Sequence, residues 1–416
     1  MRTTPPRWRM QCMCGESQSL VLRLHFQRLR CAGGLNVESE IALQRRRRLF
    51  SFPVAMFPPR SILFCLSSAF FLFVAQAANA ESPYPASSVI KGVTWDFAHT
   101  VRLAPGSDLW PITWGADDNL YAAFGDGGGF GGTNDDGRAS LGFARISGMP
   151  PEFTAVNIWG GKHAEHPAQF GGKSGSILSV DGVLYAICGV WPGKNSLKTS
   201  SSPHESRLIW SGDNGATWEQ ADWKFAEGTS TDFGVVSFLN FGRDYAGARD
   251  GYVYLYFTSS WWSWKALPSP VDSFLARVPK GKMADRSAYE FFSGTALEPK
   301  WTRDIAERRP VFSDPSRRSI NKVIYNAPLK RYLATVSGAE AGQFALFDSP
   351  EPWGAWTTIV YDDNWHDLGK IESLCYNIPT KWISNDGTEF WMVYSSVGEW
   401  DSFNLVKGNL SLSQGH

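Results

Sequence analysis

The sequence predicts an all-β protein, a five-bladed β-propeller of four-stranded antiparallel blades, and three observations lead to this fold class. No segment after residue 81 has a long run of apolar residues at helical spacing. Aromatic residues make up 14% of the chain and glycine is frequent, with 40 copies, as in proteins built of strands and turns. The third observation is a repeat, in which a polar turn precedes alternating apolar and aromatic residues at 118–124, 181–188, 250–257, 328–335 and 386–393. Recurrence at intervals of about 55–80 residues is typical of propellers.

Each repeat has the same neighbours in the chain. A short apolar run precedes it, at residues 110–114, 176–180, 235–241, 323–325 and 381–384. A return strand follows it, at residues 141–146, 208–211, 274–278, 344–347 and 403–406. Two strands joined by a turn, then a longer connection and a further strand, leave room for a fourth strand and so predict a four-stranded blade.

The two ends of the repeat region are expected to meet. The fifth unit runs out of chain at residues 410–412, whereas the strand-like residues 93–103 precede the first unit without a blade of their own. The sequence therefore predicts that this N-terminal strand completes the last blade and closes the ring, which removes exposed sheet edges.

Two local motifs support the same architecture. Residues 211–218 fit the pattern S-x-D-x-G-x-T-W, an Asp-box turn that is specific to propellers and carries no catalytic meaning. Residues 284–292 predict a helical turn that leads into the outer strand of the third blade.

The first eighty residues are expected to lie outside the propeller domain. Residues 56–80 read as a signal peptide, with Arg60, an apolar run and an A-x-A cleavage site at 78–80. We expect residues 1–55 to be a disordered, over-extended N-terminus, residues 81–416 to form one catalytic domain, and the mature protein to be secreted or periplasmic. An uncleaved membrane anchor and a basic N-terminal arm are the alternatives.

Charge and cysteine content exclude several classes of protein. Residues 81–416 carry 37 Asp and Glu against 29 Lys and Arg, because Glu16, Glu38, Glu40 and eleven arginines lie in residues 1–80. This acidic balance removes the electrostatic basis for a nucleic-acid partner. Of the six cysteines only Cys188 and Cys375 lie after residue 80, so a disulfide framework does not organise the fold.

A carboxylate pair is the candidate catalytic machinery. Asp108 stands just before the first apolar run, and Asp126 stands just after the second run in a glycine-rich loop. Because the two strands are expected to run antiparallel, residues at the outer ends of the pair return to one edge of the sheet. Paired carboxylates serve glycosidic cleavage as an acid and a base or nucleophile. The alternative is a turn cap and a solvated loop acid.

The loops beside the predicted channel supply candidate substrate-binding residues. Strands nearest the axis of a propeller line a channel, and loops at one rim build the site. Polar and aromatic side chains expected to orient or stack on the sugar are Trp110, Lys173, Trp191, Asp232, Trp262, Asn321 and Lys381. Solvated turn lysines, an asparagine bonded to backbone and tryptophans packed between blades are the alternative interpretations.

Three other motifs do not meet the requirements of the binding sites that they resemble. Residues 127–132 fit G-x-G-x-x-G, but no helical pattern follows, so no dinucleotide site is expected. Residues 163–166 lack the H-E-x-x-H arrangement of a zinc site, and residues 134–137 lack the distal glutamate of a calcium loop. We therefore expect no cofactor and no metal.

Several motifs together resemble a known family. Residues 107–111 (SDLWP), 125–132 (GDGGGFGG), 275–280 (LARVPK), 285–292 and 400–405 (WDSFNL) are similar to the domain-of-unknown-function 4185 family. The resemblance covers residues 93–410 and implies a five-bladed propeller. Some members are endo-D-arabinanases of glycoside hydrolase family 183, so the resemblance implies that Asp108 and Asp126 form the catalytic pair.

The function predicted from these observations is a secreted, monomeric hydrolase that cleaves furanosidic linkages of a polysaccharide. An endo-acting arabinanase with D-arabinan as substrate is the specific expectation, with no stable membrane association once the signal is cleaved. A sialidase would need an arginine triad, which the rim residues do not supply. The alternative from another class is a non-catalytic propeller that only binds glycan.

Overall fold

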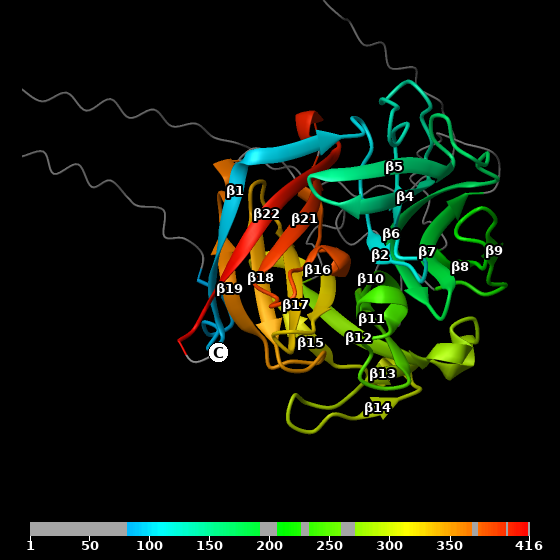
Figure 1. Ribbon diagram of the computed structural model, residues 1–416. Helices are drawn as coiled ribbons and strands as arrows, with labels where there is room; N and C mark the ends of the chain where they lie inside the picture. Colours follow the sequence, from blue (N-terminus) through cyan, green and yellow to red (C-terminus); the bar gives the residue numbers. More distant parts are fainter. Residues whose placement is uncertain are drawn as a thin grey trace, which may run out of the picture. The chain divides into compact units, whose positions relative to one another are not determined.

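The computed structural model describes residues 81–191, 206–225, 233–258, 271–367, 373–396 and 398–414 of the chain. These residues form strands and turns without an α-helix (Figure 1). Within them no helix has the length and hydropathy needed to cross a membrane. The fold is therefore all-β, as predicted.

The N-terminal strand pairs with the C-terminal strand, which confirms the predicted partnership. One four-stranded antiparallel sheet has the order β1-β22-β21-β20. Its strands are β1 (Ile90–Leu103), β22 (Phe403–Leu412), β21 (Glu389–Ser396) and β20 (Ser373–Asn377). Figure 1 shows β1 (blue) lying along β22 (red), and their register runs from Ile90 opposite Leu412 to Leu103 opposite Phe403.

Two further four-stranded sheets follow the chain in simple order. The first consists of β2 (Ile112–Trp114), β3 (Leu120–Phe124), β4 (Gly142–Met149) and β5 (Glu152–Trp159). The second consists of β6 (Gly171–Val180), β7 (Val183–Trp191), β8 (Ser206–Ser211) and β9 (Glu219–Gln220). All pairs within them are antiparallel, so consecutive strands are joined as hairpins.

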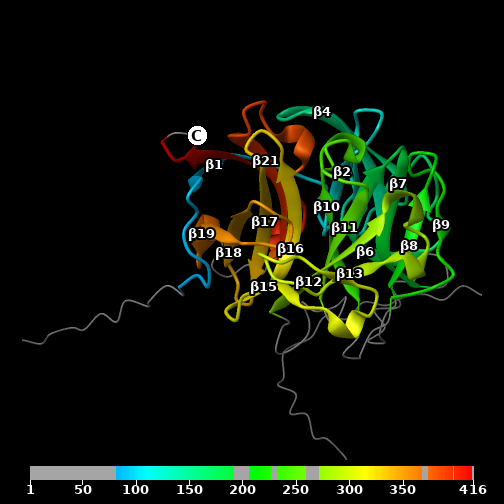
Figure 2. The ribbon, with the colours of Figure 1, turned by 90° about the horizontal axis from the view of Figure 1, so that it is seen from below.

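The remaining strands form one ten-stranded sheet instead of two separate blades. Its strands are β10 (Gly234–Asn240), β11 (Tyr252–Thr258), β12 (Asp272–Pro279), β13 (Glu290–Phe292), β14 (Trp301–Thr302), β15 (Pro310–Ser313), β16 (Arg317–Asn326), β17 (Arg331–Gly338), β18 (Phe344–Ser349) and β19 (Thr357–Asp362). Two antiparallel groups, β10–β15 and β16–β19, join where β10 meets β16 through only two parallel residue pairs, Leu239 with Val323 and Asn240 with Ile324. Figure 2 shows β6–β9 and β16–β19 on opposite sides of β10 and β11.

A narrow cavity lies where the first strands of these groups converge. Residues of β2, β6, β10 and β16 line it, together with Asn377 and Ile378 at the end of β20. Strands from five different parts of the chain thus face one cavity, although the sheets number four in the described part of the chain and not the five separate blades expected.

The sequence prediction placed one inner strand at the wrong residues. Residues 381–384 were expected to form the first strand of the last unit, but the strand that occupies this position is β20. Residues 380–382 form a short 3₁₀ turn after Pro379, with Trp382 buried beneath it. The apolar content of this turn misled the prediction, because β20 itself is partly polar.

Short 3₁₀ turns mark several connections between strands. They are η1 (Arg243–Tyr245), η3 (Lys280–Lys282), η4 (Arg286–Ala288), η5 (Ile305–Glu307), η6 (Trp365–Asp367), η7 (Thr380–Trp382) and η8 (Gly398–Trp400). The turn η4 leads directly into β13, as residues 284–292 predicted. Its N-cap is Asp285, whose carboxylate accepts the Ser287 amide hydrogen bond at 3.0 Å.

Apolar clusters connect each sheet to the next. Buried side chains of β3–β5 pack against those of β6–β8, and these strands pack in turn on the ten-stranded sheet. A third cluster joins β16–β18 to β20–β22. The fourth joins β21 and β22 to β2–β4 and includes Trp110 and Trp382. The last sheet therefore packs directly against the first.

The Asp-box forms the turn between β8 and β9. Asp213 accepts hydrogen bonds from the backbone amide and the hydroxyl of Thr217, and Ser211 Oγ accepts the Gly215 amide at 2.8 Å. Trp218 folds under the turn and stacks on Phe143 of β4, with ring centroids 4.1 Å apart. The motif thus links two sheets and lies apart from the candidate catalytic residues.

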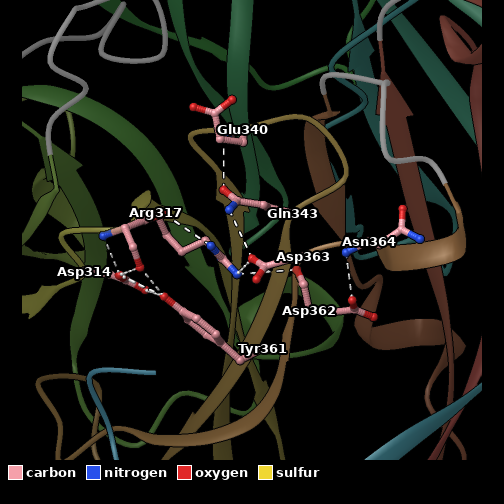
Figure 3. Close-up of polar contacts among 9 residues, drawn as sticks. Asp314, Arg317, Glu340, Gln343, Tyr361, Asp362, Asp363 and Asn364 are labelled. Atoms are coloured by element: carbon pink, nitrogen blue, oxygen red, sulfur yellow. Dashed lines mark hydrogen bonds and ion pairs between the residues drawn. The ribbon is translucent and has the colours of Figure 1, made fainter. Parts of the chain in front are cut away.

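A buried arginine organises the polar network shown in Figure 3. The Arg317 guanidinium lies over the Tyr361 ring at 4.1 Å and pairs with Asp363 Oδ1 at 2.6 Å. Gln343 donates to the same oxygen at 3.1 Å, and the Tyr361 hydroxyl bonds Asp314. The network ties β16, β19 and the β17–β18 connection together, so its first role is structural.

Candidate active site

Asp108 and Asp126 lie on neighbouring segments that two backbone hydrogen bonds hold together. The Asp108 N–H donates to the Gly125 carbonyl at 2.9 Å, and the Gly125 N–H donates to the Asp108 carbonyl at 3.1 Å. These bonds extend the β2–β3 pairing beyond the strands themselves. Asp126 directly follows the paired residue and has a left-handed backbone, with φ of 63°.

Trp110 anchors the segment that carries Asp108. Its ring is completely buried and packs on Phe124, Phe130 and Phe403 at centroid distances of 5.1–5.2 Å. The indole N–H donates to the Ser107 carbonyl at 2.8 Å. A ring enclosed in this way presents no face to a sugar, so the prediction that Trp110 stacks on substrate is wrong; its role is to position Asp108.

Glycines allow the loop after Asp126 to pack closely on the Asp108 segment. A Cβ on Gly127 would stand 2.2 Å from Ser107 Oγ and 2.5 Å from the Gly106 carbonyl oxygen. The buried Asn157 amide holds the other side of the loop by donating to the carbonyls of Gly128 and Phe130 at 3.1 and 3.0 Å. The glycine-rich stretch is therefore a packed support for the two aspartates.

Two cations neutralise Asp126. Lys173 of β6 forms an ion pair with Asp126 Oδ1, and the Arg138 guanidinium lies 3.4 Å from the same oxygen. The Asp126 side chain is 37% exposed whereas that of Lys173 is 11% exposed, so the carboxylate is reachable while its cationic partner is nearly enclosed. Two positive charges therefore face one oxygen of Asp126.

Asp108 has the opposite environment. Its Oδ1 is buried and has no hydrogen-bond partner among the described residues. Desolvation raises the pKa of Asp108 above its ordinary value and the Asp126 charge raises it further, while Lys173 and Arg138 oppose both effects. Asp108 is thus the carboxyl that favours the protonated state.

A glycine is required where these groups converge. A Cβ on Gly125 would lie 2.7 Å from Lys173 Nζ and 2.9 Å from Asp108 Oδ1. Both side chains therefore lean over the same point of the backbone. The Gly-Asp-Gly sequence at 125–127 follows from this crowding.

Asp401 is a third carboxylate of the site, and the sequence reasoning did not assign it a role. Burial raises the pKa of Asp401 to about 6, and the charges of Asp108 and Asp126 contribute to the shift. Its backbone carbonyl accepts the Gly106 N–H at 2.6 Å. The one signal in the sequence was its place in the WDSFNL motif at residues 400–405.

Two of the predicted substrate-binding residues have other contacts. Lys381 pairs with Asp118 at 3.0 Å in the β2–β3 turn, at the far end of β2 from Asp108, so its predicted place beside the catalytic pair is wrong. The Asn321 amide oxygen accepts the Tyr376 N–H at 3.0 Å and thereby links β16 to β20. Of the predicted polar residues, Lys173 is the one that the structure brings to the carboxylates.

For three further predicted residues the structure describes no side chain, so their roles stay predictions. Trp191 ends β7 with its backbone paired to Gly171. Asp232 and Trp262 lie outside the described residues. Within the described ranges, no three carboxylate, imidazole or thiol groups are arranged to hold a metal ion.

The family comparison agrees with the resemblance noted from the motifs. The family described as Domain of unknown function (DUF4185) matches residues 175–371 of this chain. No curated protein is similar to the chain in sequence.

Solved structures similar to the chain include several glycoside hydrolases. A GH43_1 enzyme from Xanthomonas citri complexed with xylose is 13% identical with a TM-score of 0.42, covering 76% of this chain and 92% of that one. A family 117 glycoside hydrolase from Zobellia galactanivorans is 9% identical with a TM-score of 0.41, covering 79% and 93%. A Trypanosoma rangeli sialidase mutant is 11% identical with a TM-score of 0.40, covering 78% and 60%. Likeness at this level assigns no activity to this chain.

Proposed function

From a chain whose residues 175–371 match the DUF4185 family, we propose a glycoside hydrolase in which Asp108 is the general acid and Asp126 is the base or nucleophile. The observation that carries the proposal is the contrast between the two carboxyls. Asp108 has a buried Oδ1 without a hydrogen-bond partner among the described residues, whereas the Asp126 side chain is 37% exposed and is held by two cations. Neighbouring carboxyls with opposed environments are the arrangement that acid–base chemistry at a glycosidic bond requires.

The chemistry assigns one step to each carboxyl. The Asp108 carboxyl gives its proton to the glycosidic oxygen as the bond from that oxygen to the anomeric carbon breaks. Asp126 either takes a proton from the attacking water or attacks the anomeric carbon itself, and water then releases the sugar. The anomeric configuration of the first product, read by NMR, distinguishes these two routes.

The proposed substrate is a neutral polysaccharide of furanose units, with D-arabinan first and endo cleavage expected. The resemblance of residues 93–410 to a family that includes endo-D-arabinanases supports this choice. The charge of the site agrees with it, because Lys173 and Arg138 are both engaged by Asp126 and three carboxylates surround them. With Asp108 protonated, Asp126 and Asp401 balance these two cations, so no surplus positive charge is left for an anionic sugar.

The proposal includes the architecture and the location of the protein. The five antiparallel groups that face the central cavity are interpreted as five blades, with β1 completing the last one. Residues 56–80 are interpreted as a signal peptide, so the mature protein is proposed to be exported and to act as a monomer.

Isosteric substitution of each carboxyl tests the function. Asp108→Asn and Asp126→Asn are each expected to lower kcat on D-arabinan by about 10²–10⁴ with little change in thermal stability. The assay is release of oligosaccharides, resolved by chromatography, from D-arabinan, L-arabinan and galactofuranan. Asp222→Asn is the matched control, because Asp222 is exposed in the bend after β9.

Two results would contradict the proposal. Wild-type rates in either Asn variant would remove the pair from the chemistry. Glycan binding by calorimetry without release of products from any of the three polysaccharides would instead identify the protein as a binding module.

A further inference from the structure

We propose that Ser395, a buried serine of β21, is a positioning residue for Asp108, because it holds the strained turn at Leu109 that fixes where the Asp108 carboxyl lies. Cys375 and Asn377 of β20 complete this hold by bonding the carbonyl of the same residue. The inference rests on the proposed function, in which Asp108 is the general acid. It gives the last sheet a part in the geometry of a site whose two carboxyls belong to the first sheet.

The backbone directly after Asp108 has an unusual conformation. Leu109 and Trp110 have φ of 73° and 45°, so two consecutive residues with side chains occupy the left-handed region that favours glycine. The Trp110 N–H donates to the Asp108 carbonyl at 3.0 Å and closes a three-residue turn around Leu109. Such a turn with positive φ at its centre is rare and strained, and it persists only where the surrounding structure holds it.

Side chains of the last sheet bond both polar backbone groups of Leu109. The Leu109 N–H donates to Ser395 Oγ at 3.1 Å. The Leu109 carbonyl accepts hydrogen bonds from the Cys375 thiol and from the Asn377 side-chain amide, the latter at 3.4 Å. Burial raises the pKa of the Cys375 thiol, so the thiol keeps the proton that it donates. The strained residue is therefore held from a part of the chain that is distant in sequence.

The three holding side chains also contact one another. Cys375 and Ser395 lie opposite each other in the β20–β21 pairing, and their side-chain sulfur and oxygen are 3.3 Å apart. Asn377, two residues further along β20 and so on the same face, donates to Cys375 Sγ at 3.4 Å. None of the three is more than 3% exposed. Because each side chain restricts the others, they present a fixed set of partners to Leu109.

Asp108 lies between this set and a second fixed contact. Its own N–H and carbonyl are paired with Gly125, and the enclosed ring of Trp110 anchors the segment beyond the turn. These contacts remain when Ser395 is changed, so the segment is expected to stay in the fold. The turn at Leu109 would lose its hold, and a relaxed turn rotates the backbone that carries the Asp108 carboxyl.

Ser349 of β18 provides a matched control. It is fully buried like Ser395, and its Oγ accepts the Glu351 N–H at 3.3 Å in a turn of the ten-stranded sheet. Replacement of either serine by alanine removes one acceptor from a backbone amide, so both variants are expected to lose thermal stability to a similar extent. Only Ser395→Ala is expected to change the candidate site.

Titration of Asp108 tests the inference without requiring activity. The aspartate carboxyl carbons of the protein are labelled with ¹³C, and Asp108→Asn identifies the Asp108 resonance. In Ser395→Ala the midpoint of the Asp108 titration is expected to fall by about 0.5 pH unit or more, because a relaxed turn lets water reach the buried carboxyl. The midpoint is expected to stay in place in Ser349→Ala and in Cys375→Ser, which keeps a donor for the carbonyl of the turn.

Activity gives a second, separate readout. In Ser395→Ala, kcat on D-arabinan is expected to fall by about 10- to 100-fold while KM changes by less than about twofold, because the general acid acts in the transition state and not in substrate binding. Cys375→Ala is expected to behave in the same way, with kcat largely restored in Cys375→Ser. Ser349→Ala is expected to keep the wild-type kcat.

Several outcomes would overturn the inference. An Asp108 midpoint in Ser395→Ala within about 0.2 pH unit of the wild type would do so, and so would a kcat within about twofold. An equal loss of kcat in Ser349→Ala would reduce the role of Ser395 to stability. If Ser395→Ala does not fold, Cys375→Ala decides by the same two limits. If the wild type hydrolyses no glycan, the proposed function fails, and the Asp108 midpoint alone decides the role of Ser395.

Discussion

At the residue scale, three aspartates of the candidate site lie in two different kinds of surroundings. Asp126 is exposed and paired with Lys173 and Arg138, whereas Asp108 and Asp401 each have a buried oxygen without a hydrogen bond. The sequence singled out Asp108 and Asp126 because each flanks a strand of one predicted hairpin. The sequence did not single out Asp401, because only the packing of the last sheet against the first brings this residue to the site.

The raised pKa of Asp401 predicts how the stability of the folded domain depends on pH. Its folded-state pKa is raised to about 6 from an ordinary value of 3.8, so the folded state holds the proton more tightly than the unfolded chain. The contribution of Asp401 to the free energy of unfolding is therefore largest below about pH 4 and is lost as the pH rises through about 6. Asp401→Asn is expected to be more stable than the wild type at pH 8 by about 1 kcal/mol, after allowance for partial exposure, with no gain at pH 4.

Urea unfolding at both pH values measures this difference. A variant that is less stable than the wild type at pH 8 would show that the Asp401 carboxylate is compensated in solution. Asp222→Asn, measured in parallel, accounts for effects of the substitution itself.

At the element scale, the loop after β3 and the Asp-box turn have similar compositions but different purposes. In the loop, glycines such as Gly125 and Gly127 stand where neighbouring atoms leave no room for a Cβ. The Asp-box instead uses Asp213 and Ser211 to bond its own backbone. The sequence pattern alone identified the Asp-box turn as structural. The packing role of the glycine loop is visible only in the three-dimensional structure.

The glycine loop is expected to tolerate no side chain at residue 127. In Gly127→Ala the new Cβ would meet Ser107 Oγ at 2.2 Å, which displaces the segment that carries Asp108. We expect kcat/KM to fall by about 10²-fold, because small misplacements of catalytic groups are costly. Gly251→Ala, where nothing lies within 4 Å of the added Cβ, is the control. Equal activity of the two variants would mean that the loop adjusts without moving Asp108.

The Asp-box is expected to affect stability alone. Partial burial acts to raise the pKa of Asp213, but hydrogen bonds from Thr217 and Ser211 outweigh it and lower the pKa below its ordinary value. Its contribution is therefore present above about pH 4 and lost as the pH falls further. Asp213→Ala is expected to cost about 1 kcal/mol at pH 7 with unchanged kcat, and Asp222→Ala close to nothing. Denaturation at pH 7 and pH 3 measures both, and a cost that is no smaller at pH 3 than at pH 7 contradicts this account.

At the scale of the whole domain, the N-terminal strand joins sheets that are distant in the chain. Trp95 of β1 meets Phe344, Trp365 and Phe390 edge to face, at centroid distances of 5.4–5.8 Å. Near the ends of the strand pair, the Ser413 N–H donates to the Val89 carbonyl at 2.9 Å. Residues from both ends of the described chain therefore complete one sheet.

Removing the Trp95 ring is expected to destabilise the domain as a unit. Trp95→Ala should cost about 3 kcal/mol, because it empties a site shared by three aromatic neighbours on other elements. Trp114→Ala, which removes a half-buried ring that stacks on no aromatic ring of the described residues, should cost less than half as much. Chemical denaturation followed by circular dichroism measures both, and equal costs would show that β1 contributes little to the cohesion of the sheets.

The sequence by itself determined the strands, the turns and the first two carboxylates. The repeated phrase placed β3, β7, β11, β17 and β21, and the unpaired residues 93–103 pointed to the β1–β22 pairing. These features are local, since alternation of side chains along a strand and the chemistry of turns are written in consecutive residues. The strand expected at 381–384 failed for the same reason, because a buried 3₁₀ turn carries the same apolar residues.

Only the tertiary structure decided which groups share the site and in what state. Lys173, Arg138 and Asp401 reach Asp108 and Asp126 from β6, from the far side of the glycine loop and from the turn before β22. Burial, which raises the pKa of Asp108 and of Asp401, exists only once the first and last sheets pack together. Electrostatics depends on distance and on exclusion of water, and neither is a property of neighbouring positions in the chain.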